Sequence, residues 1–131
     1  MKNEDLIYKA QSVVNERKIS HGFTIGDVGA ALVSQKGNVY VVVCIDVVSG
    51  IGFCAEHAAI AAMVTGGEQR IAKIVAVLGD GTVLPPCGRC REFMFQIDQR
   101  NLDETEVILG SDSVVKLREL LPHPWHDAFK E

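Results

Sequence analysis

Two short segments of the chain carry side chains that can build a catalytic metal site. They are Cys54-Ala-Glu56 and Pro86-Cys87-Gly-Arg-Cys90. Three cysteine thiolates bind Zn²⁺ well, and three protein ligands leave the fourth tetrahedral position open to water. A carboxylate two residues from the first ligand is placed to take protons from that water and to return them. The pattern therefore predicts a hydrolytic zinc centre with Cys54, Cys87 and Cys90 as ligands and Glu56 as the proton carrier.

The spacing of the cysteines also indicates which elements hold them. Cys87 and Cys90 are three residues apart, which places them on one face of the first turn of a helix. Cys54 stands at the start of a second predicted helix. Unpaired N–H groups and partial positive charge at helix starts favour the thiolate form. We therefore expect two helix starts to direct their thiols to one point.

Each part of this pattern has an alternative interpretation. A single cysteine is often only a small buried hydrophobic residue, and Cys-x-x-Cys is also a redox motif. The redox motif normally follows the first strand of its fold, whereas here it follows the third predicted strand. A closed structural zinc site would require Cys44, which ends an apolar strand and has no paired spacing. The helix dipole alone would also favour Glu56 in a first turn.

The rest of the chain alternates between helical and strand patterns. Apolar spacings of three and four predict a helix over 3–17, and glycines make 20–26 a loop. Two strands joined by a glycine turn follow. The second strand is apolar throughout, which indicates that both of its faces are covered. The predicted ranges are strands 28–33, 39–43, 71–78, 106–109 and 114–117, and helices 54–64, 88–99 and 118–121. This order predicts an α/β fold with helices on both faces of one sheet.

Composition limits the class of partner. The 131 residues predict a single domain over 1–131, and 47% hydrophobic with 23% charged residues is typical of a globular protein. No apolar run is long enough for a membrane span, and the polar start lacks a signal-peptide core. We therefore expect a cytoplasmic protein with reduced thiols. The net charge of −4 and the absence of a basic stripe favour a small molecule over a nucleic acid as partner.

At the cysteine segments the chain resembles the zinc-dependent cytidine deaminase superfamily, whose members pair [His/Cys]-x-Glu with a later Pro-Cys-x-x-Cys. It is most similar to the small homotetrameric branch, which uses three cysteines and includes free-cytidine and blasticidin-S deaminases. Similarity at 28–31 and 119–122 extends the resemblance from about residue 27 to 122. The resemblance implies a three-layer α/β/α sandwich with a single mixed sheet of about five strands, and a homotetramer.

The resemblance also implies a reaction. Zn²⁺ on the three cysteines would supply activated water, and Glu56 would move protons while the amino group at C4 of a cytosine ring is replaced. The products would be the uracil form and ammonia. Backbone groups at Ala55 and Pro86 are expected to contact the edge of the base.

Several positions depart from this branch. Members of this branch usually carry an Asn-x-Glu pair that holds the ribose hydroxyls. This chain has Cys44-Ile-Asp46 in the matching stretch, and Asp46 still offers an acceptor for a sugar hydroxyl. An aromatic residue usual three positions before the early glycine is replaced by Gly26. These departures favour a modified nucleoside, so a blasticidin-S-type deaminase is the alternative within the class.

Other predicted roles concern the surroundings of the metal and the pocket. His57 stands where the branch often has arginine, and three thiolates outweigh the charge of Zn²⁺. Hydrogen-bond donors to the sulfurs, here His57 and Arg91, are predicted to restore the acidity of the metal. The alternative for His57 is a histidine that faces solvent or is satisfied within the core. Family members cover the pocket with C-terminal aromatics, so Trp125 is predicted to line its own or a neighbouring pocket, or else to pack at a domain edge or interface.

The sequence thus predicts a zinc-dependent hydrolase that deaminates a free cytosine nucleoside or a close analogue. A structural-zinc interaction module is the alternative from another class. A polynucleotide editor is a third interpretation, which the acidic charge disfavours.

Overall fold

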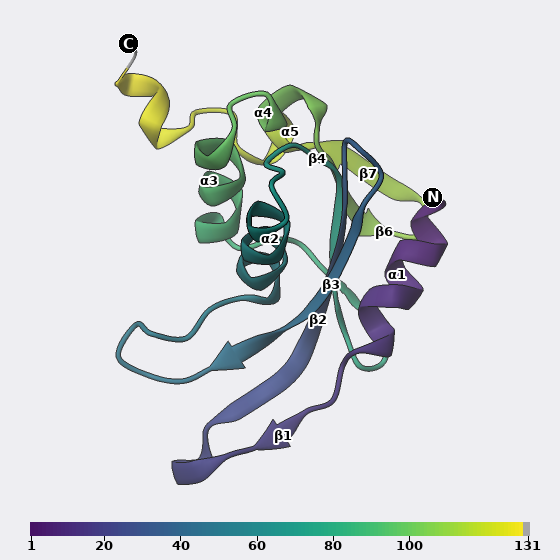
Figure 1. Ribbon diagram of the computed structural model, residues 1–131, viewed down its shortest axis with the longest axis vertical. Helices are drawn as coiled ribbons and strands as arrows, with labels where there is room; N and C mark the ends of the chain where they lie inside the picture. Colours follow the sequence, from purple (N-terminus) through teal and green to yellow (C-terminus); the bar gives the residue numbers. More distant parts are fainter. Residues whose placement is uncertain (130–131) are drawn as a thin grey trace.

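One mixed β-sheet lies between two layers of helices in the computed structural model, which describes residues 1–129 (Figure 1). Helix α1 packs on one face, and the other α-helices pack on the opposite face. The α-helices are α1 (Asn3–Ser12), α2 (Ala55–Thr65), α3 (Gly88–Ile97), α4 (Asn101–Glu104) and α5 (Leu117–Leu120); the 3₁₀ helices are η1 (Ser20–Gly22) and η2 (Trp125–Ala128). The expected three-layer α/β/α sandwich is confirmed.

The main sheet has the strand order β3-β2-β4-β6-β7. Two short strands complete it, β1 beside β2 and β5 beside β4. The strands are β1 (Arg17–Lys18), β2 (Thr24–Ser34), β3 (Val39–Asp46), β4 (Ile71–Leu78), β5 (Val83–Leu84), β6 (Glu106–Gly110) and β7 (Ser113–Lys116). All pairs are antiparallel except β4 with β6. The sheet thus has seven strands rather than about five, because two-residue strands leave no periodic pattern in the sequence.

The core is divided by the sheet into two main clusters. Strand β4 sends Ile74 toward the cluster under α2 and α3, and sends Val75 and Val77 toward the cluster under α1. Both faces of this central strand are therefore buried, which explains its continuous apolar run. Strand β3, in contrast, pairs only with β2. Its residues 39–43 are half-buried because it forms an edge of the sheet, although apolar side chains cover both its faces.

The first helix ends earlier than its apolar pattern predicts. It stops at Ser12 rather than continuing to residue 17. The backbone N–H of Asn15 instead donates to the carbonyl of Gly26 at 2.8 Å, and β1 then pairs with β2. Pairing with a strand distant in sequence therefore takes the last turn away from the helix. Within the described residues, none of the helices has the length and apolar character that crossing a bilayer requires.

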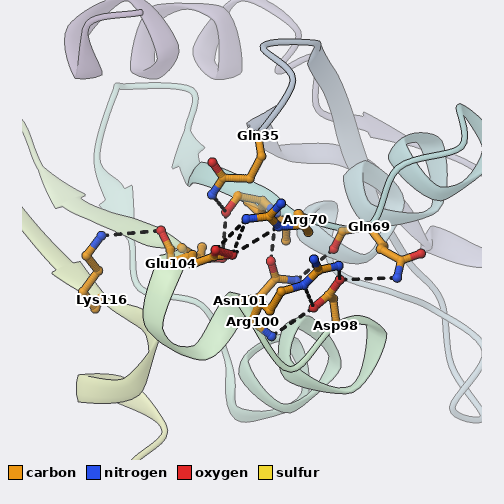
Figure 2. A network of polar contacts seen from close by, with 10 residues as sticks. Gln35, Gln69, Arg70, Asp98, Arg100, Asn101, Glu104 and Lys116 are labelled. Carbon is orange, nitrogen blue, oxygen red and sulfur yellow. Dashed lines mark hydrogen bonds and ion pairs between the residues drawn. The ribbon is translucent and has the colours of Figure 1, made fainter.

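A polar network at the start of β4 fixes the second helical layer (Figure 2). Asn101 is fully buried, and its side chain accepts from the N–H of Ile71 at 2.9 Å. It also donates to the carbonyls of Gln69 and Met94. Beside it, Arg70 forms a two-pronged ion pair with Glu104, the shorter contact being 2.6 Å. The network thus ties α3 and α4 to the sheet at the end of β4 remote from the cysteines.

Replacing Asn101 with alanine is expected to lower the free energy of unfolding by about 3 kcal/mol, because two buried backbone groups and one part-buried group lose their partner. Urea denaturation followed by circular dichroism measures this. Gln99→Ala, at an exposed neighbouring position, is the control and should change stability by less than about 0.5 kcal/mol. Equal effects of the two substitutions would contradict a stabilising role of the network.

Candidate metal centre and substrate cavity

The structure brings the three predicted zinc ligands together at the starts of two helices. Cys54 is the N-cap of α2, Cys87 is the N-cap of α3, and Cys90 lies in the first turn of α3. The Cys87 Sγ atom lies 3.5 Å from the Sγ atoms of both Cys54 and Cys90, and the latter two lie within 4.8 Å of each other. A tetrahedral zinc site with Zn–S bonds of about 2.3 Å requires sulfur atoms about 3.8 Å apart. The thiol set therefore fits Zn²⁺ in both chemistry and spacing.

The three thiols differ in their surroundings. Burial raises the pKa of Cys90, and burial together with a hydrogen bond to Cys87 raises that of Cys54. Burial acts in the same direction on Cys87, but the backbone N–H of Cys90 and neighbouring donors bring its pKa below the ordinary value. Cys87 is thus the group most ready to become a thiolate. A cation is needed to hold all three as thiolates at neutral pH.

Glu56 is buried beside the thiols. It is the second residue of α2, and its side chain is only 6% exposed. Burial raises the pKa of its carboxyl, and its own backbone N–H partly offsets this effect. Within residues 1–129, the hydrogen bond that this carboxylate accepts comes from its own backbone N–H, so the buried acid is not left without a partner. A buried carboxyl with a raised pKa is suited to take up and release protons near neutral pH.

A cavity of about 170 Å³ lies against these groups. Its walls come from the starts of α2 and α3, from β2, β3 and β4, and from the loop that follows β5. The lining residues are Val28, Cys44, Asp46, Cys54, Ala55, Glu56, Ala76, Leu84, Pro85 and Cys87. Two of the predicted substrate-binding residues, Asp46 and Ala55, thus reach this cavity. Pro86 lines a smaller adjoining hollow together with Glu56.

His57 contacts the metal centre from outside the cavity. Its Nδ1 atom lies 3.2 Å from the Sγ of Cys90, and its ring stacks on Phe93 at a centroid distance of 4.5 Å. Burial lowers the pKa of its imidazole, and the charge of Arg89 acts in the same direction. His57 lines a surface hollow with Arg89 and Phe93 rather than the cavity. This contact is the one that the predicted donor role requires, and His57 also lies within 4.8 Å of the Cys54 sulfur.

Arg91 does not contact the sulfurs that it was predicted to serve, and Trp125 lies outside the cavity of its own chain. The Arg91 side chain donates to the carbonyls of Pro86 and Leu120, at 2.8 and 3.2 Å, and reaches no thiol in the described chain. It therefore fixes the backbone at Pro86 rather than a sulfur. Trp125 is 65% exposed, packs on Phe129 and does not line the cavity of its own chain.

Asp27 contacts Cys44, one of the cavity-lining residues, and the sequence interpretation missed it. Its carboxylate accepts from the Cys44 thiol at 2.8 Å, and Asp46 lies 3.6 Å from the same sulfur. Burial and the hydrogen bond to Asp27 raise the pKa of Cys44 to about 12. Cys44 therefore donates to Asp27, and its sulfur clusters with the Asp27 and Asp46 carboxylates rather than with the other thiols, which argues against its role as a fourth zinc ligand.

A β-bulge places Asp27 in this position. The β2–β3 register shifts between Ile25, opposite Ile45, and Gly29, opposite Val43. Residues 26–28 consequently share one opposing residue, Cys44, and such bulges redirect side chains. Gly26 adopts a φ of +77°, and a Cβ there would lie 2.5 Å from the carbonyl oxygen of Asn15. A glycine inside a strand pattern is the signal that could have revealed the bulge.

Comparisons with known proteins agree with this geometry. Residues 2–103 match the family model described as the cytidine and deoxycytidylate deaminase zinc-binding region. Cytidine deaminase from Mycobacterium tuberculosis is 39% identical over 70 residues, which are 53% of this chain and 53% of that protein. The chain therefore aligns with about half the length of the curated relatives it matches.

Solved structures match over a greater length. A mutant cytidine deaminase from Mycobacterium tuberculosis superposes with a TM-score of 0.79 at 28% identity, covering 95% of this chain and 98% of that one. Cytidine deaminase from Mycobacterium leprae gives 0.76 at 28% identity, covering 94% and 100%. The enzyme from Burkholderia pseudomallei gives 0.73 at 27% identity, covering 95% and 100%. Since the family model spans more than half of the sequence, the chain belongs to the cytidine and deoxycytidylate deaminase zinc-binding family.

Proposed function

We propose that this protein, as a single domain over residues 1–131, is a zinc-dependent hydrolase of free cytosine nucleosides or close analogues. The observation that carries the proposal is the shared cavity of about 170 Å³, into which two of the clustered thiols and the buried Glu56 open. A closed structural site would not need a buried acid beside an open space. Family membership supports the same reaction class.

The proposed reaction follows from the placement of Glu56. Zn²⁺ held by Cys54, Cys87 and Cys90 would lower the pKa of a bound water toward neutrality. The Glu56 carboxylate takes a proton from the attacking water and delivers it to N3 of the ring. A second proton passes through Glu56 to the amino group at C4, the C4–N bond breaks, and ammonia leaves. The raised pKa of Glu56 suits it to both directions of transfer.

The remaining groups of the site position the substrate and the metal. Ala55 lines the cavity at the start of α2, and Arg91 holds the carbonyl of Pro86 by a hydrogen bond of 2.8 Å. These two backbone segments are proposed to contact the edge of the base. His57 is proposed to donate to the Cys90 sulfur, which draws charge from the metal. Asp46 is proposed to bind the sugar side of the substrate.

We further propose a homotetramer in which Trp125 covers the cavity of a neighbouring subunit. Trp125 is largely exposed and outside its own cavity, as a residue that serves a second copy would be. Four free cysteines also suit the reducing cytoplasm. Sedimentation velocity and cell fractionation test these assignments; a monomer, or a secreted protein, would contradict them.

A substrate panel tests the proposed function. The purified, zinc-loaded protein is incubated with cytidine, deoxycytidine, blasticidin S and other modified cytosines, and deamination is followed by ultraviolet absorbance. At least one compound should lose its amino group, and removal of zinc by a chelator should stop the reaction. Absence of turnover with every cytosine compound would contradict the proposal.

A further inference from the structure

Besides binding a metal, two thiols placed three residues apart at a helix start can form a disulfide, and Cys87 and Cys90 have this arrangement. Cys87 is the N-cap of α3, Cys90 lies in its first turn, and their sulfur atoms are 3.5 Å apart. A disulfide bond is about 2.05 Å long, so the two sulfurs need to approach by about 1.5 Å. Rotation of two short side chains supplies such a movement within one turn of α3.

The two thiols differ in their access to solvent. Cys87 is exposed and lines the cavity of about 170 Å³, whereas Cys90 is fully buried and does not line it. Oxidation of a thiol depends on its exposure as well as on its thiolate character. A small oxidant that enters the cavity therefore meets the sulfur of Cys87, and Cys90 contacts that sulfur from the protein interior.

The interior position of Cys90 makes it the partner of an oxidised Cys87. Displacement at sulfur proceeds in line, so the attacking sulfur has to stand opposite the leaving oxygen. An oxygen that Cys87 takes up from the cavity lies on the open side of its sulfur, and Cys90 lies on the buried side. The Cys54 sulfur is equally near to that of Cys87, at 3.5 Å, but it lines the same cavity as the oxygen. The Cys44 sulfur clusters with two carboxylates instead.

We propose that Cys87 and Cys90 form a reversible redox pair that releases the metal when hydrogen peroxide enters the cavity. The Cys87 thiolate attacks one peroxide oxygen, the O–O bond breaks, and the products are a sulfenic acid and hydroxide. The Cys90 sulfur then attacks the Cys87 sulfur, the S–O bond breaks, a second hydroxide leaves, and the S–S bond forms. The two thiols thus lose two electrons and two protons, and the peroxide is reduced to two molecules of water.

The disulfide removes two of the three proposed zinc ligands, so the metal leaves and hydrolysis stops. Cys54 alone remains, and one thiolate does not hold Zn²⁺ in a tetrahedral protein site. Because the neighbouring thiol traps the sulfenic acid before further oxidation, the change stops at a stage that cellular thiols reverse. This inference goes beyond the proposed function, since it requires the three-thiol metal centre but no particular substrate.

Peroxide treatment of the zinc-loaded protein tests the proposal. Released zinc is measured with a chromophoric chelator against an untreated sample, and free thiols are counted by titration. Each chain should release about one zinc ion, and its free thiols should fall from four to about two. A dithiol reductant followed by zinc should restore both quantities. Cleavage after Arg89 separates Cys87 from Cys90, so only a disulfide keeps their peptides joined in mass spectrometry.

Two variants identify the pair. Cys54→Ser should still form the Cys87–Cys90 disulfide, although it binds zinc weakly. Cys44→Ser removes the thiol outside the cluster and should leave the zinc release and the loss of two thiols unchanged. A disulfide that maps to Cys54, an irreversible loss of thiols, zinc that stays bound in excess peroxide, or a protein that takes up no zinc would overturn the inference. These readouts do not depend on turnover, so absence of deamination with every cytosine compound would overturn only the proposed function.

Discussion

Glu56→Gln is expected to lower kcat by about 10²- to 10⁴-fold while one zinc ion per chain stays bound. The amide has the size of the acid and fits the same buried position at the start of α2, but it cannot take a proton from water and return it. The three thiols keep their positions, because none of them hydrogen-bonds to the Glu56 side chain. Ultraviolet assays of deamination, combined with metal analysis by mass spectrometry, measure both quantities on one sample.

Glu16→Gln provides the matched control for this substitution. It makes the same change of charge at an exposed position outside the cavity, and both activity and zinc content should remain those of the unmodified protein. Thermal melting should show that Glu56→Gln stays folded, since the substitution removes a buried charge. Full deamination by Glu56→Gln would show that another group carries the protons. A structural-zinc module would lack turnover even with Glu56 in place.

Cys90→Ser is expected to remove zinc and activity together. The Cys90 sulfur is fully buried between the two helix starts, and a serine hydroxyl is a poor replacement for a thiolate. Loss of one of the ligands should weaken zinc binding by about 3 kcal/mol, roughly 100-fold in affinity. Competition with a chromophoric chelator measures this change, and the activity assay should show a parallel loss.

His57→Phe distinguishes a three-thiol centre from one that includes the histidine. His57 lies as close to the Cys54 and Cys90 sulfurs as a ligand would, so geometry alone permits both sets. Phenylalanine keeps an aromatic ring to stack on Phe93 and removes both ring nitrogens. We expect this variant to retain its zinc with a reduced kcat, because a donor to the Cys90 sulfur is lost. Loss of zinc comparable to that of Cys90→Ser would instead show a closed centre with His57 as a ligand.

The features that were predictable from the sequence are those encoded locally. The i, i+3 spacing of Cys87 and Cys90 requires only the first turn of one helix, and the structure places them there. The β-branched run over 71–78 is β4 with the same limits. Apolar alternation and helix starts are properties of neighbouring residues, and the three-layer architecture follows from their order.

The features that were missed depend on contacts between distant segments. Asp27 follows residues interpreted as a loop, and only the pairing of β2 with β3 reveals that it faces Cys44. The early end of α1 likewise depends on the hydrogen bond between Asn15 and Gly26. Arg91 was assigned to the sulfurs by proximity in sequence, whereas its side chain turns to the carbonyls of Pro86 and Leu120. Sequence spacing does not specify such directions.

The left-handed backbone at Gly26 has a consequence for how this cavity could change over evolutionary time. Any side chain at this position would have its Cβ 2.5 Å from the Asn15 carbonyl oxygen, in a conformation that only glycine adopts readily. An aromatic residue, as the related branch carries, is therefore not reachable by one tolerated substitution. The bulge and its contact with Asn15 must be rebuilt first, and that rebuilding would displace Asp27 from Cys44. The order in which mutations occur thus restricts which substrate specificities neighbouring sequences can acquire.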